Sequence, residues 1–176
     1  MSGHSKWSQI KHKKAVVDAK RSKVFSKFAK LIAVESRLAG GDVTTPSLKA
    51  IIDKAKAANM PKNNIERAVQ KGKGGEGTSD EKITYELYGP GGVAILVDTL
   101  TDNRNRTNQE LKHMVSTLGY QMAEPGAASW AFSKEESEWV PTTTIPLAGE
   151  DVEKLEALVG VLDDHDDVQQ VTTNAA

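Results

Sequence analysis

Two arginines stand where a helix is expected to begin. Apolar residues at helical spacing predict a helix over residues 103–118, which Gly119 ends. Arg104 and Arg106 fall in its first turn, where the helix dipole disfavours cations by about 0.3–1 kcal/mol each. A bound phosphate would reverse the sign, because the exposed N–H groups and both guanidiniums would favour it. The candidate phosphate site comprises Asn103, Arg104, Asn105 and Arg106.

A structural alternative for these arginines is ion pairing. Arg106 stands one helical turn before Glu110, and Arg104 lies close in sequence to Asp98 and Asp102. A second predicted helix, over residues 150–162, carries acidic residues in its first turn, as the dipole favours. Since the sequence follows the dipole rule there and breaks it at residue 104, the phosphate hypothesis stands beside the ion-pair alternative.

A basic segment with one aromatic residue occupies residues 2–23. Lys and Arg suit contacts to backbone phosphates, and the indole of Trp7 can stack on an unpaired base. The structural alternative is a solvated basic arm in which Trp7 packs against neighbouring helices. The candidate nucleic-acid-binding residues are Lys6, Trp7, Lys11, His12, Lys13, Lys14, Lys20, Arg21 and Lys23.

The formal net charge of −1 conceals an uneven division of charge. Residues 1–73 contain 17 Lys and Arg against 5 Asp and Glu, whereas residues 74–176 contain 6 against 19. A cationic first half predicts a polyanion as partner. The acidic second half suits contact with a protein.

The histidines do not have the spacing of a catalytic or metal centre. His4, His12, His113 and His165 lie in different predicted elements, and DDHDD at 163–167 lacks the alternation and glycine of an EF-hand loop. We therefore expect a non-enzymatic protein with no cofactor and no metal.

The composition also bears on location. The chain has no cysteine, which rules out disulfides and favours a reducing compartment. No apolar run approaches the roughly 18–20 residues of a membrane span. A cytoplasmic protein without membrane contact is expected.

Three amphipathic helices are expected in a basic domain over residues 1–72. The first ends at Gly40–Gly41, the second opens at Thr45–Pro46, and the third runs from Pro61 to Gly72. The Gly-rich stretch 73–82 predicts a linker. The residues expected to face outward include Lys27, Lys30, Arg37, Lys49, Lys54, Lys56, Lys62, Arg67 and Lys71.

Residues 83–176 are expected to form an acidic α/β domain, which makes the fold class α+β. Pro90–Gly91 suits a type II turn between two strands of alternating apolar residues. From Val93 the order is βαββαβ, the ferredoxin-like plan, preceded by one extra strand. The predicted strands are 83–88, 92–99, 127–133, 139–147 and 167–173, and the helices are 103–118 and 150–162.

Several long motifs resemble one known family. With GHSKW, IKHKK and DAKR at the start, then NMPKNNIERA and YGPGGVAILVDTLTDNRNRT, the sequence resembles the YebC/PmpR family, which includes mitochondrial translational activators of cytochrome oxidase subunit I. The resemblance covers residues 2–133 and resumes in TTTIPL and DDHDDVQQV. It implies a helical N-terminal domain and two α/β domains, one inserted in the other. This chain crosses from WAF to the Thr-rich strand by KEESEW alone, so the inserted domain is expected to be absent.

The resemblance also implies a function. It implies DNA-binding transcriptional regulation through the basic N-terminal domain, and it also implies a role in translation at the ribosome. We predict a nucleic-acid-binding regulator of weak sequence selectivity, because no helix directing Asn, Gln and Arg at base edges stands out. The alternative is a ribosome-associated translation factor that binds ribosomal RNA, and the sequence does not distinguish the two.

Overall fold

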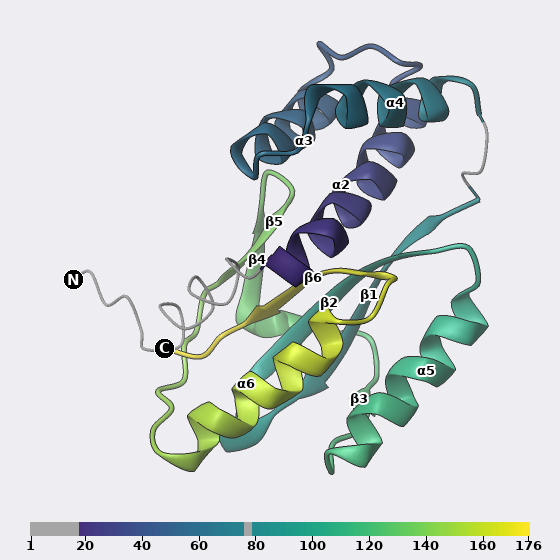
Figure 1. Ribbon diagram of the computed structural model, residues 1–176. Helices are drawn as coiled ribbons and strands as arrows, with labels where there is room; N and C mark the ends of the chain where they lie inside the picture. The colour runs from purple at the N-terminus through teal and green to yellow at the C-terminus, as the bar shows by residue number, and fades with distance from the viewer. Residues whose placement is uncertain (1–17, 76–78) are drawn as a thin grey trace. The chain divides into compact units, whose positions relative to one another are not determined.

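The computed structural model describes residues 18–75 and 79–176. These residues form two compact units (Figure 1). The helical unit contains the described residues up to 81 together with 100–102, and the α/β unit contains residues 82–99 and 103–176. None of the described helices is long and apolar enough to cross a membrane.

The helical unit consists of α2 (Asp18–Leu38), α3 (Pro46–Ala57) and α4 (Lys62–Lys73). Gly40 and Gly41 both have positive φ, which allows the chain to turn after α2. Each helix buries one apolar face, so that a single core forms between them. The core includes Ile32, Leu48, Ile52, Ala55, Met60, Ile65, Ala68 and Val69.

The α/β unit is built on a four-stranded antiparallel sheet in the order β3-β1-β2-β6. The strands are β1 (Glu81–Tyr88), β2 (Ala94–Thr101), β3 (Met122–Ala123) and β6 (Val168–Thr173). The short helix η1 (Pro90–Gly92) joins β1 to β2, and Gly91 has a φ of 67°, as a type II turn requires at that position.

Both faces of β2 are covered. Alternate residues such as Ile95 and Val97 share a core with α5 (Arg104–Thr117) and α6 (Glu150–Asp163), which lie on the same side of the sheet (Figure 1). The intervening Leu96 packs on the other face with Phe132 and Ala128. This two-sided burial explains why β2 is buried at every position but Asp98, which is half-buried, unlike a strand with one solvent-exposed face.

The α+β class is confirmed, but the strands predicted at 127–133 and 139–147 are corrected. β4 (Phe132–Glu135) and β5 (Glu138–Pro141) form a separate two-stranded sheet, and η2 (Ser129–Ala131) precedes them. In the main sheet, β1 takes the place beside β2 that the ferredoxin-like plan gives to the strand at 139–147.

A buried carboxylate is the physical reason that the strand predicted at 127–133 does not begin at residue 127. Glu86 accepts hydrogen bonds from the backbone N–H groups of Gly126, Ala128 and Ser129. Those N–H groups are therefore unavailable to a strand ladder, and the chain turns at residues 126–129 instead of extending.

Candidate functional site

The helix predicted over residues 103–118 is α5, and Asn103 is its N-cap residue. The Asn103 side chain accepts a hydrogen bond from the Arg106 backbone N–H at 3.1 Å, which satisfies one of the free donors of the first turn. Arg104 and Arg106 consequently lie in that first turn, and both are exposed.

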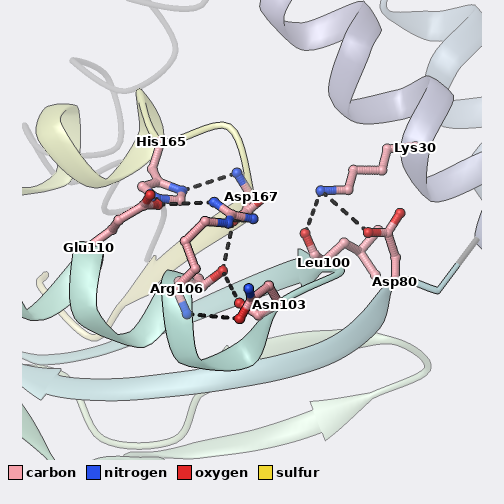
Figure 2. A network of polar contacts seen from close by, with 9 residues as sticks. Lys30, Asp80, Leu100, Asn103, Arg106, Glu110, His165 and Asp167 are labelled. Atoms are coloured by element: carbon pink, nitrogen blue, oxygen red, sulfur yellow. Dashed lines mark hydrogen bonds and ion pairs between the residues drawn. The ribbon is translucent and has the colours of Figure 1, made fainter.

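Arg106 is bound by two carboxylates (Figure 2). Its Nη1 lies 3.1 Å from Glu110 Oε2, and its Nη2 lies 2.9 Å from Asp167 Oδ2. The Asp167 side chain is only 7% exposed, and the Thr107 hydroxyl donates to the same Oδ2 at 2.7 Å. The ion pair with Glu110 predicted as the structural alternative is present, and Asp167 is a second partner.

His165 joins this cluster through both ring nitrogens. The backbone N–H of Asp167 donates to His165 Nδ1 at 3.1 Å, so Nδ1 carries a lone pair. The hydrogen-bond network therefore assigns the ring proton to Nε2, which lies 2.7 Å from Glu110 Oε2. The cluster links the start of α5 to the segment between α6 and β6.

The same cluster has the residue types of a metal site. Glu110, His165 and Asp167 place their ligand atoms within 4.8 Å of one another. A metal ion would have to displace Arg106 from both carboxylates, and it would have to move the His165 ring proton off Nε2 before that nitrogen could bind the ion. The geometry therefore favours an ion-pair cluster that holds α5 in place.

The phosphate site at Asn103, Arg104, Asn105 and Arg106 stays a prediction. All four residues are exposed. A phosphate at this helix end would meet two carboxylates as well as two guanidiniums, which weakens the electrostatic argument for it.

Sequence reasoning missed Asp167, which lies 60 residues from Thr107. The only signal was its place in the acidic DDHDD run.

The predicted nucleic-acid-binding residues lie mostly outside the described residues. Lys20, Arg21 and Lys23 belong to α2, where Arg21 is exposed and Lys23 is half-buried. Their role in binding stays a prediction. The candidates outside the described residues are Lys6, Trp7, Lys11, His12, Lys13 and Lys14.

Exposed cations cover the outer faces of α3 and α4. Glu66, Asp53 and Asp42 are the exposed acidic residues among residues 21–75, so this surface is predominantly basic. Its exposed cations are Lys49, Lys54, Lys56, Lys62, Arg67, Lys71 and Lys73.

Lys30 does not face outward as expected. Its Nζ donates to the Leu100 carbonyl at 2.6 Å and lies 3.9 Å from Asp80 (Figure 2). The Lys30 side chain is 25% exposed, and it ties α2 to the chain at residues 80 and 100. Lys30 is therefore engaged within the helical unit and is not counted in the basic surface.

The fold and these charges define an α+β protein with a basic three-helix unit and an acidic sheet unit. The family model "TACO1/YebC protein N-terminal domain" matches residues 5–75, and "TACO1/YebC second and third domain" matches residues 80–136 and 133–175. The chain belongs to the TACO1/YebC family.

The relatives share this chain's sequence to different extents. A "Probable transcriptional regulatory protein" of Desulforamulus reducens is 37% identical over 238 positions, covering 99% of this chain and 98% of the relative. One of the same description from Trichlorobacter lovleyi is 55% identical over 137 residues, covering 77% of this chain and 56% of the relative. The chain thus matches about half the length of that relative.

A solved structure supports the fold. The crystal structure of a conserved hypothetical protein from Aquifex aeolicus matches with a TM-score of 0.83 and 34% identity, covering 98% of this chain and 97% of the other. The D. reducens alignment is longer than this chain of 176 residues, so that relative contains residues with no counterpart here. The extra residues of the relative agree with the expected absence of the inserted domain from this chain. That absence stays a prediction.

Proposed function

We propose that the protein is a DNA-binding transcriptional regulator that contacts the phosphate backbone through its basic helical unit. The observation that carries the proposal is the predominantly basic outer surface of α3 and α4. The names of the D. reducens and T. lovleyi relatives support regulation of transcription. The proposal assigns the protein a binding role without catalysis and a cytoplasmic location.

The physical basis is counterion release. Each Lys or Arg that neutralises a DNA phosphate releases a condensed cation, so affinity falls as salt rises. With about six to eight phosphate contacts, a plot of log K against log salt should have a slope near −5 to −7 for duplex DNA. The acidic α/β unit is left for contact with a protein partner.

Charge reversal on α3 tests the proposal. A variant with Lys49→Glu, Lys54→Glu and Lys56→Glu is compared with wild type by fluorescence anisotropy on a labelled duplex, from about 50 to 200 mM salt. We expect the variant to bind at least about tenfold more weakly, with a shallower salt slope. Thermal unfolding of both proteins checks that the helices remain folded.

A matched control reverses the same number of charges elsewhere. Lys112→Glu, Lys134→Glu and Lys154→Glu change exposed lysines of the acidic unit. If this control weakens binding as much as the α3 variant, the total charge and not the basic surface governs affinity. A wild-type affinity that is independent of salt would end the proposal.

The basic segment is tested separately. Charge reversal at Lys11, Lys13 and Lys14 should reduce the DNA captured by crosslinking in cells, if this segment forms part of the contact. If the amount of captured DNA does not change, the basic segment is not part of the DNA contact, and the proposed contact is restricted to the described helices.

A role in translation is the alternative function that would replace this proposal. The same lysines can bind ribosomal RNA, since its phosphates carry the same charge. Co-sedimentation with ribosomes that survives DNase and weakens in high salt, together with no binding to duplex DNA, would assign the basic surface to RNA.

A further inference from the structure

One face of α4 carries a set of polar side chains of which only Arg67 is also counted in the basic surface. Asn63, Glu66, Arg67 and Gln70 are all exposed and line one shallow hollow. The opposite face of α4 is buried in the core of the helical unit. The polar face is therefore fixed outward by the packing of the helix that carries it.

These residue types are the ones that recognise base edges. Asn and Gln form paired hydrogen bonds with adenine, Arg forms them with guanine, and Glu accepts from the cytosine amino group. Helical spacing places all four of these side chains on one face, and contacts to base edges are the ones that carry sequence information.

Arg67 is held in position by its own helix. Its Nε donates to the Asn63 carbonyl at 3.4 Å, and its Nη2 donates to Asn64 Oδ1 at 2.5 Å. A guanidinium has more N–H donors than these two contacts use, so further donors remain for a partner. Because the Arg67 side chain is ordered before binding, less conformational entropy is lost when it binds a partner.

Cations flank the polar face at both ends of α4. Lys62 and Lys71 are exposed, and the exposed Lys62 to Glu66 pair at 3.7 Å is a weak contact that a ligand can break. The arrangement suits a polyanion whose phosphates lie on either side of a groove. The major groove of B-DNA admits a helix, whereas the narrow major groove of A-form RNA does not.

We propose that α4 enters the major groove of duplex DNA and reads base edges through Asn63, Glu66, Arg67 and Gln70. This inference rests on the proposed function and names the element that would give it sequence selectivity. Weak selectivity among DNA sequences is predicted from the amino-acid sequence, whereas a recognition helix would make affinity depend on the DNA sequence.

Selection from a random duplex library tests this inference. Wild-type protein is used to enrich a sequence, and affinities are then measured for the enriched duplex and a scrambled duplex of equal length. Arg67→Lys keeps the charge but loses the planar fork that pairs with guanine. We expect it to lower the ratio of the two affinities by about 5- to 100-fold, with an unchanged salt slope.

Two further variants separate base reading from other effects. Gln70→Ala should also lower the affinity ratio while leaving the scrambled duplex bound within about twofold of wild type. Lys71→Ala should weaken both duplexes equally and reduce the salt slope by about one. Thermal unfolding of each variant checks the integrity of the helical unit.

The outcomes distinguish this inference from the proposed function. If wild type binds every duplex equally, or if Arg67→Lys and Gln70→Ala retain the enriched sequence, the inference is overturned and backbone binding survives. Equal binding of duplex RNA through α4, or capture of an acidic protein in place of DNA, also overturns it. If wild type binds no duplex at all, both proposals fall together.

Discussion

Glu86 shows how one buried side chain sets the path of a distant loop. Glu86 is 7% exposed, and its carboxylate lies 2.9 Å from the Ala128 nitrogen and 2.6 Å from the Ser129 nitrogen. Burial raises the pKa of the Glu86 carboxyl, but the hydrogen bonds from Gly126, Ala128 and Ser129 outweigh burial and leave the pKa below its ordinary value of 4.5. The loop at residues 126–129 is therefore stabilised by the ionised form of the Glu86 carboxyl.

We predict that Glu86→Gln destabilises the protein by about 1–3 kcal/mol near neutral pH, because an amide presents its own donors to backbone N–H groups and carries no charge. The free energy of unfolding is measured by urea denaturation. The lowered native pKa means that the ionised carboxylate stabilises the fold above the unfolded value of about 4.5. The advantage of wild type over the variant should shrink as pH falls below that value toward the native pKa.

Glu124→Gln is the control at the residue scale. Glu124 is an exposed carboxylate in the same loop region, so the substitution should leave the free energy of unfolding within about 0.5 kcal/mol of wild type. Equal stability of the Glu86 variant and wild type across the whole pH range would contradict the role given to its carboxylate.

At the scale of elements, α2 and α4 approach each other closely at a glycine. A methyl group added at Gly72 would stand 2.2 Å from the Ala33 carbonyl oxygen and 2.7 Å from Ser36 Cβ. The Ser36 hydroxyl donates to the Val69 carbonyl at 2.7 Å across the same contact. Gly72 thus permits the close packing that fixes α4, the proposed recognition helix, against α2.

We expect Gly72→Ala to lower the free energy of unfolding of the helical unit by about 1–3 kcal/mol, since the clash involves backbone that cannot yield freely. Chemical denaturation followed by circular dichroism provides the measurement. In an open helix the same change would be stabilising, because alanine favours helix over glycine by about 1 kcal/mol.

Gly74→Ala provides the matched comparison. Its φ is −73°, and an added methyl would lie 3.5 Å from the nearest atom, the Gln70 carbonyl oxygen. Alanine there should be neutral or slightly stabilising. Should both substitutions have the same effect on unfolding, close packing at Gly72 would not be the cause.

At the scale of the whole molecule, the two units have separate cores. Leu48 belongs to the core of the helical unit, whereas Leu158 belongs to the core between α5, α6 and the sheet. Both side chains are completely buried. Among the described residues, each of these two cores is made of side chains from one unit.

We predict that Leu48→Ala and Leu158→Ala each destabilise the unit that contains the substitution, by about 2–5 kcal/mol, because each leaves a cavity in one core. Hydrogen exchange followed by mass spectrometry locates the effect. Protection should fall in α3 and α4 for the first variant, and in α6 and β6 for the second. Equal loss of protection in both units for either variant would show that the cores unfold together.

The sequence by itself determined the features that depend on near neighbours. Helical spacing, glycines and prolines located α5, α6 and the turn at Pro90–Gly91, because these signals act over a few residues. The division of charge between the two halves also follows from the sequence alone. The long motifs and the matching models agree on the family.

Only the tertiary structure decided which distant groups meet. Asp167 pairs with Arg106, Glu86 turns the chain where a strand was expected, and packing on α2 determines which face of α4 is outward. These outcomes depend on hydrogen-bond donors and buried charges finding partners far along the chain. Local periodicity carries no information about such pairs, because it records which face of an element is apolar and not what lies against it.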